Sequence, residues 1–506
     1  MTDLFQKLKR IVSEEYISDS IYIRHAYSRN VDPILQGVPD YVIRPKDEFE
    51  ISEILKVANE ERIPVIPRGG GDCEFGGSKP IGDTGIVLDL TRMNQILNID
   101  YENLVVSVET GITWASLNEV LSQHGLYTGC LGPGSGLTAS IGGGLSHHSV
   151  GGGGGAKYGS CSNQLVSLEV VLPTGEIIET GSQANKYSKV PFNRFGNGPD
   201  LASLFCGDNG IYGVKTKATL QVFPKPPYIE YKTFLMPRKS NEVSSRIFYQ
   251  IREKGIDVYD SIFFMDLLVS VGVQNGFFPI WENLKRKRGT MFYVIEANSE
   301  GELKEKVNQL DRIFINNKAE SLGQEISEGN IAKWFYEEQG HWLYAHNLWG
   351  LVPGFESLDA ECKVPILAYP AILQDLDQWD FEHKEDMDKI LNIAGMRPVT
   401  GSGPIILLKG NTVELTCGFT SFSSYIKGEY HPELEEINLS LWKSILERVT
   451  KHGVMWYMMG DITSRLMVDI EAYGEDFYKV MKSLKLTLDP NGILSTGKYN
   501  FWLREV

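Results

Sequence analysis

The 506-residue sequence contains no pair of closely spaced cysteines. No two of its six cysteines form a Cys-x-x-Cys motif, since they are scattered singly at Cys73, Cys130, Cys161, Cys206, Cys362 and Cys417. A disulfide framework is not expected in so long a chain, and neither is a metal or iron–sulfur site with thiolate ligands. Any redox chemistry must therefore use an organic cofactor or pass its electrons to another protein.

Long apolar segments and an excess of positive charge are also missing. No apolar run reaches the roughly 20 residues that a membrane-spanning helix needs, and the start, MTDLFQKLKRIVSEEY, lacks the apolar core of a signal peptide. We therefore expect no membrane span and a cytoplasmic location. The formal net charge of −16 would repel nucleic acid and anionic lipid, so neither is expected as a partner.

Glycine, by contrast, is abundant between Tyr127 and Gly159, in the stretch YTGCLGPGSGLTASIGGGLSHHSVGGGGGAKYG. This much glycine predicts that the stretch is not helical. Apolar residues are threaded through it, unlike in a flexible linker, and we expect them to be buried: Leu131, Leu137, Ile141, Leu145 and Val150. Because glycine lets the main chain approach a flat or charged ligand closely, the stretch predicts a cofactor-binding surface rather than a surface loop.

A strand–helix–strand pattern lies upstream of this stretch. Tyr41–Pro45 and Ile63–Pro67 read as strands around a helix at Lys46–Arg62, and a glycine loop, RGGGDCEFGG, follows at Arg68–Gly77. Such a loop at the carboxyl end of a strand can offer backbone N–H groups to a pyrophosphate, with Arg68 nearby. Its spacing is not GxGxxG, so a nicotinamide fingerprint is not supported, and a tight structural turn is an equally open interpretation.

Further helices and strands are predicted in the rest of the first half of the chain. The first 40 residues read as one amphipathic helix followed by an irregular segment. Strands are predicted at Thr84–Asp89 and Leu104–Glu109, with a connection between them, and a helix at Thr113–Gly125. Leu165–Leu172 and Glu176–Thr180 predict a hairpin. The prolines at positions 224 and 226 mark a domain boundary.

Several of these segments, in this order, resemble the FAD-binding superfamily of vanillyl-alcohol oxidase and para-cresol methylhydroxylase, including its branch of glycolate oxidase subunits and D-lactate dehydrogenases. The matching pieces are YVIRPKDEFEISEILKVANEERIPVIPRGGG, GIVLDLTRMNQIL, VETGITWASLNEVLSQHGL, GPGSGLTASIGGGL, KYGSCSNQLVSLEVVLPTGEIIETG, LFCGDNGIYGVKTKATLQVFPKP and, at the C-terminus, LDPNGILSTGKYNFW. They cover residues 41–226 and 488–502, whereas the region from 227 to 450 carries no matching motif.

The resemblance implies an α+β fold that binds FAD. It implies an N-terminal helical segment (1–40), an FAD-binding domain of two α+β subdomains (41–226), a substrate-covering cap with an antiparallel sheet flanked by helices (227–450), and a C-terminal segment that returns to the flavin (451–506). The residues that it implies for FAD binding are Pro67, Arg68, Gly69, Gly70, Gly71, Asp72, Pro133, Gly134, Ser135, Ile141, Gly142, Gly143, Gly210, Gly213, Val214, Lys498 and Asn500.

Three departures from the family pattern shape the expected chemistry. Asp72 stands where relatives that tether FAD through this loop have histidine, and Cys130 is one residue out of register with a cysteinyl tether, so noncovalent FAD is predicted. The segment His147–Gly155 holds an insertion relative to the family loop. The hydroxy-acid branch often holds a metal with an HxGDGxxH-like segment, but this chain offers only Met459–Thr463 without flanking histidines, so no metal is predicted.

Oxidation next to a flavin needs a held C–H bond and a group that accepts a hydroxyl proton. His147 and His148 are candidate catalytic residues by their position. The resemblance adds Tyr457 and Arg465, which lie where phenol-oxidising relatives place residues that bind a phenolate, although without the tyrosine–arginine adjacency of those relatives. The two histidines can equally be structural, since an imidazole readily hydrogen-bonds loop backbone, and Arg465 can simply pair with a surface acid. The aromatic cluster WFYEEQGHWLYAHNLWG, from Trp334 onward, can shape a pocket but more often forms a core.

The sequence therefore predicts an FAD-dependent oxidoreductase that takes hydride from a carbon bearing a hydroxyl group or from a benzylic carbon. A 2-hydroxy acid is slightly favoured over a para-substituted phenol. A flavin subunit that relays electrons within a larger complex is an alternative, and a non-redox enzyme like alkylglycerone-phosphate synthase is disfavoured because the C-terminal half lacks its histidine cluster. Expected partners are a small-molecule substrate, an electron-acceptor protein, and a second subunit in a homodimer or hetero-complex. The basic run Lys285–Arg288 is more often a solvated face, and docking of an acidic electron-transfer partner is its less common interpretation.

Overall fold

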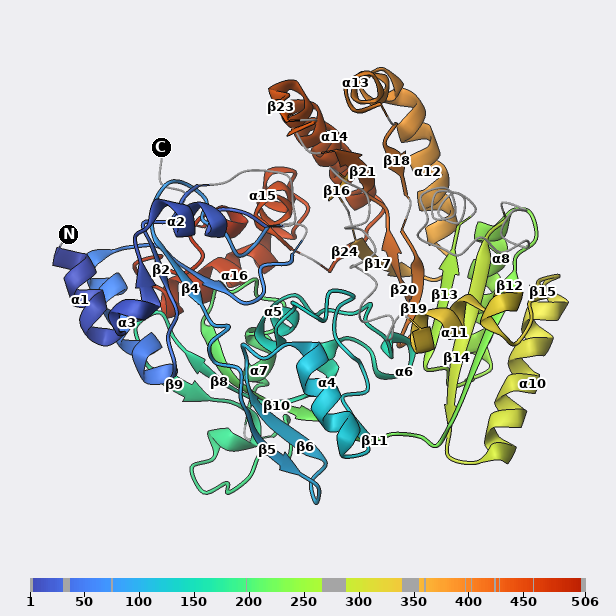
Figure 1. Ribbon diagram of the computed structural model, residues 1–506, viewed down its shortest axis with the longest axis horizontal. Coiled ribbons are helices and arrows are strands. Elements are labelled where there is room, and N and C mark those ends of the chain that lie inside the picture. The colour runs from blue at the N-terminus through green and yellow to red at the C-terminus, as the bar shows by residue number, and fades with distance from the viewer. Residues whose placement is uncertain are drawn as a thin grey trace.

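The computed structural model describes residues 3–30, 37–73, 76–196, 198–265, 288–338, 355–358, 361–395, 397–401, 403–422, 425–426, 428–457 and 459–501. Two parts lie side by side in Figure 1. A four-stranded and a five-stranded sheet with their helices form the left part, and an eight-stranded antiparallel sheet with its helices forms the right part. The mixture of helices and largely antiparallel sheets confirms the predicted α+β class.

The four-stranded sheet has the order β1-β2-β4-β3, with bounds Ile17–Ser18, Tyr41–Ile43, Ile86–Asp89 and Val65–Arg68. Helix α3 (Glu48–Glu61) joins β2 to β3, and both strands run parallel to β4. The N-cap Asp47 accepts a hydrogen bond from the Glu50 backbone N–H, and one face of the helix, including Ile51 and Leu55, is buried. The predicted strand–helix–strand unit is confirmed, and β3 ends at the glycine loop.

The prediction of one helix and an irregular segment in the first 40 residues is wrong. The chain forms α1 (Asp3–Ile11), the short 3-10 helix η1 (Glu14–Tyr16), strand β1 and α2 (Ile21–Tyr27). In β1, Ile17 is buried and pairs with Ile43 at the edge of β2. A strand this short exists because the neighbouring edge offers hydrogen bonds, and sequence periodicity carries no signal for it.

The five-stranded sheet is antiparallel, with the order β5-β6-β10-β8-β9 and bounds Ile96–Asp100, Val105–Glu109, Val214–Gln221, Leu165–Val171 and Ile177–Glu179. The β8–β9 pair confirms the predicted hairpin. Strand β5 lies where only a connection was predicted, because its residues are mostly exposed and lack an apolar run. Around this sheet lie α4 (Trp114–Gln123), η2 (Cys161–Gln164), η3 (Gly181–Ala184), α7 (Leu201–Leu204) and the pair β7 (Leu126–Tyr127) and β11 (Phe223–Pro224).

The glycine-rich stretch contains two short helices, α5 (Ile141–Ser146) and α6 (Gly155–Tyr158), so the prediction that it is not helical is wrong. In α5 the Ser140 hydroxyl accepts a hydrogen bond from the Gly143 N–H at 3.2 Å. A Cβ atom on Gly144 would lie 2.6 Å from Nε1 of Trp114, so close packing requires glycine there. Tertiary contacts and a cap therefore outweigh poor helix propensity. Of the five apolar residues expected to be buried, four are, whereas Leu137 is 48% exposed.

The eight-stranded sheet has the order β15-β12-β14-β13-β19-β20-β17-β24. The bounds are Glu320–Ser321, Tyr228–Leu235, Thr290–Ala297, Asp260–Phe264, Ile405–Leu408, Thr412–Thr416, Glu361–Pro365 and Met455–Trp456. Its helices are α8 (Ser240–Glu253), α10 (Glu300–Asn316), η5 (Ile326–Glu328), α11 (Ile331–Lys333), the π-helix η6 (Trp334–Glu338), α12 (Tyr369–Glu382), α13 (Lys384–Ala394) and α14 (Pro432–Thr450). Small sheets join β16 (Phe355–Leu358), β21 (Phe419–Phe422) and β18 (Val399–Thr400), and β22 (Tyr425–Ile426) with β23 (Glu429–Tyr430).

The last part of the described chain returns from the large sheet to the first one. After β24 it forms α15 (Asp461–Asp469), α16 (Glu475–Leu488) and the 3-10 turn η8 (Lys498–Asn500). The Val65 N–H donates to the Ile493 carbonyl at 2.7 Å, and the Ser495 N–H donates to the Val65 carbonyl at 2.8 Å. These bonds fix the C-terminal segment beside β3. Among the described helices, none has both the length and the apolar character needed to cross a bilayer.

Candidate functional site

A cavity lies in the left part of the molecule, between the glycine loop after β3, helix α5 and the start of β10. It holds about 860 Å³ of empty space, including the portion open to solvent. Twelve of the seventeen residues predicted to bind FAD line it: Pro67, Arg68, Gly69, Gly70, Gly71, Asp72, Pro133, Ser135, Gly142, Gly143, Gly210 and Gly213. The fold thus brings together segments that are more than a hundred residues apart in the sequence.

The other five residues predicted to bind FAD are not in the wall of the cavity. The side chains of Ile141 and Val214 are fully buried in the two hydrophobic cores. Gly134 is buried next to the wall residue Pro133. The side chain of Asn500 donates to Asp469 Oδ1 at 2.7 Å, and Lys498 acts from behind the wall, as described below.

The wall is bare backbone where the glycine loop meets α5. A Cβ atom on Gly69 would lie 2.0 Å from the Ser140 hydroxyl, and one on Gly70 would lie 2.0 Å from the Thr138 carbonyl. The loop therefore packs against the start of α5 with no room for side chains. Backbone N–H groups next to a guanidinium suit a diphosphate, and a cavity walled by glycine backbone lets a flat ligand approach closely, so the residues present fit FAD.

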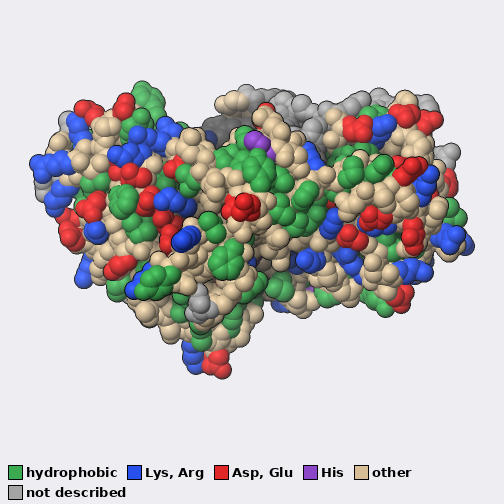
Figure 2. Space-filling view, turned by 90° about the horizontal axis from the view of Figure 1, so that it is seen from below, with side chains coloured by type: hydrophobic (Ala, Val, Ile, Leu, Met, Phe, Trp, Pro, Cys, Tyr) green, Lys and Arg blue, Asp and Glu red, His purple; other side chains and the backbone are tan. Residues whose placement is uncertain are grey.

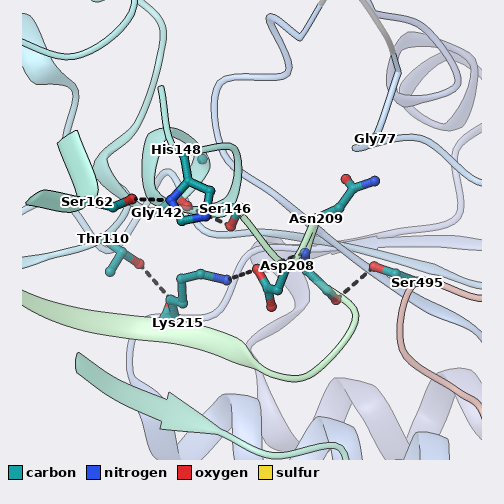
Figure 3. A network of polar contacts seen from close by, with 12 residues as sticks. Gly77, Thr110, Gly142, Ser146, His148, Ser162, Asp208, Asn209, Lys215 and Ser495 are labelled. Atoms are coloured by element: carbon teal, nitrogen blue, oxygen red, sulfur yellow. Dashed lines mark hydrogen bonds and ion pairs between the residues drawn. The ribbon is translucent and has the colours of Figure 1, made fainter. Parts of the chain in front are cut away.

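A buried ion pair and several hydrogen bonds hold the elements that form this wall (Figure 3). The ammonium of Lys215, which lines the cavity, pairs with Asp208 Oδ1 at 2.8 Å, and both side chains are almost completely buried. The Thr110 hydroxyl donates to the Lys215 carbonyl at 2.7 Å, and the Ser495 hydroxyl donates to the Gly210 carbonyl at 2.9 Å (Figure 3). Strand β10, the loop before it and the C-terminal segment are thus held as one unit.

Lys498 links the C-terminal segment to two loops of the cavity wall. Its ammonium donates to the Gly77 carbonyl at 2.5 Å, to the Asn209 carbonyl at 2.8 Å and to Asn209 Oδ1 at 3.2 Å. Asp461, the first residue of α15, accepts the Gly77 N–H at 3.1 Å. Burial lowers the pKa of Lys498 and raises the pKa of Asp461, and each charge partly offsets this effect on the other.

The two predicted catalytic histidines differ in their surroundings. His147 lines the cavity, and its Nδ1 is buried without a hydrogen-bond partner in the part of the chain that the structure describes. Burial, followed by the charges of Lys498 and Lys215, lowers its pKa to about 3, so its imidazole is neutral. His148 contacts Ser162 Oγ through Nδ1 at 2.9 Å, and burial lowers its pKa to about 4. Its ring packs against Gly207, which gives it a structural position.

The eight-stranded sheet contributes a second polar cluster. Lys363 on β17 is directly opposite Glu414 on β20, and the Lys363 ammonium lies 5.4 Å from the ring centroid of the buried Tyr457. Glu414 is 2% exposed, and its Oε2 has no hydrogen-bond partner among the described residues. The positive charge of Lys363 contributes, after burial, to the lowered pKa of His148 in the glycine-rich stretch. The fourth predicted catalytic residue, Arg465, lies on α15, where its charge acts on Asp461.

Part of the chain matches a known protein family, and the whole fold is similar to solved structures. Residues 39–181 match the family described as FAD binding domain. This chain contains an FAD-binding domain. The flavoprotein superposes with a TM-score of 0.80 on 4-ethylphenol oxidase from Gulosibacter chungangensis and on p-cresol methylhydroxylase, over 99% of this chain and 97% of theirs, at 17% and 16% identity. Its fold is therefore the predicted para-cresol methylhydroxylase type, with the eight-stranded sheet in the cap.

Sequence relatives place the flavoprotein among oxidoreductases. It is 37% identical to the glycolate oxidase subunit GlcD of Bacillus subtilis over 224 residues, which are 44% of this chain and 45% of that protein. It is 27% identical to the mitochondrial D-lactate dehydrogenase [cytochrome] of Arabidopsis thaliana over 507 aligned positions, which cover 98% of this chain and 80% of that one. The chain is an FAD-dependent oxidoreductase.

Sequence reasoning missed the charged residues that surround the site. Lys215, Asp208 and Asp461 lie within segments quoted from the sequence, but none of the three was singled out. The charges Glu361, Lys363 and Glu414 within the short strand sequences ECKVP and TVELT are a usable signal, since a buried strand rarely tolerates a charge without a purpose. Of the aromatic cluster, Trp334 and Phe335 are described and are buried in the core of the cap, whereas residues 341–349 lie outside the described residues, as do residues 285–287 of the basic run.

The thiol predicted as a possible tether is in an unreactive environment. Cys130 is fully buried, and burial raises its pKa to about 12, so it is a neutral thiol rather than a thiolate. Asp72, which stands where a histidyl tether would be, lines the cavity. Noncovalent FAD stays a prediction. Within the described ranges, no cluster of three or more His, Cys, Asp or Glu side chains is arranged to hold a metal ion.

Glu414 is expected to make stability depend on pH. Burial raises its pKa to about 7, above the value of about 4.3 in an unfolded chain, so the folded state binds the proton more tightly. The free energy of unfolding should therefore fall as pH rises between these values. The Tm of Glu414→Gln minus the Tm of the wild type should be at least about 2 °C larger at pH 8 than at pH 4.5. Glu436→Gln, on an exposed position of α14, is the control, and an equal Tm difference at both pH values would contradict the prediction.

Proposed function

We propose that this oxidoreductase binds FAD in the cavity and removes hydride from the hydroxyl-bearing carbon of a small 2-hydroxy acid. The observation that carries the substrate class is Lys363: it is a mostly buried cation on the cap sheet, and no hydrogen bond or ion pair engages its ammonium in the described part of the chain. A cation held in this way suits a substrate carboxylate. The names of the relatives, a glycolate oxidase subunit and a D-lactate dehydrogenase, support the same class.

In this proposal each residue has one task. Lys363 binds the carboxylate and orients the substrate beneath the cap. His147 lines the cavity, and its Nδ1 has no partner among the described residues, so in this proposal it accepts a hydrogen bond from the substrate hydroxyl and orients it. The glycine backbone and the ion pair of Lys215 with Asp208 hold the wall in place and exclude water. When bound, FAD supplies the acceptor for the hydride.

Replacing Lys363 with methionine tests the substrate assignment. Loss of a hydrogen bond to a charged group costs roughly 1.5–3 kcal/mol, so we expect the concentration of 2-hydroxy acid that half-saturates anaerobic flavin reduction to rise about 10- to 100-fold. Lys363→Arg should restore part of the affinity because it keeps the charge. An unchanged concentration dependence in Lys363→Met, with normal flavin content, would remove Lys363 from the substrate site.

A second candidate function, oxidation of para-substituted phenols, is favoured by the phenol-oxidising structural neighbours and by Tyr457 beside the cluster. Anaerobic bleaching of the flavin by a panel of 2-hydroxy acids and para-alkylphenols separates the two. Reduction by hydroxy acids alone supports the first function, and reduction by phenols alone supports the second. If only dithionite reduces the flavin, the chain is better explained as an electron-relay subunit.

The proposal includes an external electron acceptor, which can be a protein, and assembly as a homodimer or hetero-complex. The word subunit in the name of the Bacillus relative supports a complex. A cytoplasmic location belongs to the proposal as well, although the Arabidopsis relative is named mitochondrial.

A further inference from the structure

The segment between η3 and α7 presents an apolar surface to solvent. Tyr187, Phe192 and Phe195 are 78%, 60% and 68% exposed, and Val190 and Leu201 are 39% and 52% exposed. Scattered exposed apolar residues are normal on any protein, but here five of them fall within the fifteen positions from 187 to 201. Such a concentration is typical of a surface that another apolar body covers.

The same segment is positively charged, although the protein is strongly acidic. Residues 181–201 contain Lys186, Lys189 and Arg194 against one acidic residue, Asp200, whereas the whole chain has a formal net charge of −16. Lys186 lies 5.1 Å from the ring centroid of Tyr187, and Arg194 lies 5.6 Å from that of Phe195. Figure 2 views the molecule from below, the side toward which this segment projects in Figure 1, and this face carries apolar, basic and acidic side chains intermixed.

The segment holds this arrangement with a polar framework underneath. The Phe192 N–H donates to the Ser182 hydroxyl at 3.0 Å. Arg194 pairs with Asp200 at 2.9 Å and donates to the Ser162 carbonyl at 2.7 Å. These bonds anchor the segment through Ser182 and Arg194, whereas the rings of Phe192 and Phe195 and the side chains of Lys186 and Lys189 are exposed.

We infer that residues 181–201 dock the protein on a lipid bilayer that carries anionic headgroups. Aromatic rings enter the boundary between headgroups and acyl chains, and lysine ammonium groups contact the anionic headgroups. The expectation that anionic lipid is repelled rests on the total charge of the chain. Salt screens charges beyond about 8–10 Å, so at contact the local charge of this segment determines its electrostatic interaction with the headgroups. The negative charge of the rest of the chain repels the other faces from the membrane.

Sedimentation of the full-length protein with sucrose-loaded vesicles tests this inference. We expect binding to phosphatidylcholine vesicles that contain about 30% phosphatidylserine, and at least about tenfold weaker binding to phosphatidylcholine alone, because each lysine near an anionic surface contributes roughly fivefold. Binding should also weaken as salt is raised. Equal binding to both kinds of vesicle, or no binding to either, would overturn the inference.

Two pairs of variants assign the binding to this segment. Phe192→Ser with Phe195→Ser should lower the partition coefficient at least about tenfold without changing Tm, since both rings are exposed. The matched control is Phe49→Ser with Phe477→Ser, whose rings are 65% and 60% exposed in other parts of the surface, and it should bind as the wild type does. An equal loss in both pairs would contradict docking through residues 181–201.

The charge pair follows the same design. Lys186→Glu with Lys189→Glu should lower binding to the anionic vesicles at least about tenfold, whereas Lys304→Glu with Lys389→Glu, on exposed helix faces, makes the same change in net charge and should have little effect. Light scattering of the same proteins completes the test. If the wild type is a dimer that only the Phe192 and Phe195 variant dissociates, the surface joins two copies of the chain and the bilayer inference is wrong.

Discussion

Replacing Gly143 with valine is expected to give a folded protein that no longer binds FAD. Gly143 lines the cavity on α5, and a Cβ atom there would meet only the Ser140 hydroxyl, at 3.3 Å. The added methyl groups therefore extend into the cavity rather than into the protein core. Steric overlap between these methyl groups and FAD, worth roughly 3 kcal/mol, should weaken FAD binding by about 100-fold. The stability of the fold should change little, because the methyl groups do not enter the core.

The measurement is the flavin-to-protein absorbance ratio after incubation with FAD and gel filtration, together with Tm. Gly301→Val is the control, because Gly301 lies in a helix of the cap with open space around it. It should retain wild-type flavin content. A Gly143→Val protein that keeps a full complement of FAD would show that the cofactor lies elsewhere.

Lys498→Met is expected to lower the free energy of unfolding by about 3–5 kcal/mol. The variant leaves the Gly77 and Asn209 carbonyls without their donor, and it removes the cation that offsets the buried Asp461. Because Gly77 is also part of the cavity wall, FAD affinity should fall at the same time. Chemical denaturation with and without FAD measures both effects.

The control for this variant is Lys479→Met, since Lys479 pairs with Glu475 on the exposed face of α16 and should contribute less than about 0.5 kcal/mol. Adding Asp461→Asn to Lys498→Met should cost less than the sum of the two single changes, because each variant already removes the partner of the other. Additive losses, or a Lys498→Met protein as stable as the wild type, would show that this cluster does not brace the cavity.

Local patterns explain why much of the fold and part of the site could be predicted. The β2–α3–β3 unit and the β8–β9 hairpin follow from apolar periodicity and turn residues, and the glycine loop from Arg68 onward is visible because glycine itself is the signal. Such features depend on neighbours in the sequence.

The rest depends on contacts between distant residues. Lys498 meets Gly77 across 421 positions, and Lys363 faces Glu414 only because of the register of β17 against β20. Helix α5 forms despite the low helix propensity of its glycines, because it packs against Trp114 and has a serine N-cap. No window of the sequence contains these partners together, so the pairings that these charges make behind the cavity and in the cap could not be derived from local patterns, although Lys498 itself was implied by the family resemblance.

The hydrogen bonds between β3 and the C-terminal segment have a consequence for how the protein matures. Val65 bonds to Ile493 and Ser495, so the cavity wall is braced by residues that leave the ribosome long after the glycine loop does. Contacts of such long sequence separation form late in folding. In the nascent chain the cavity is therefore expected to lack this bracing. Tight binding of FAD is then expected only after the C-terminal segment has folded.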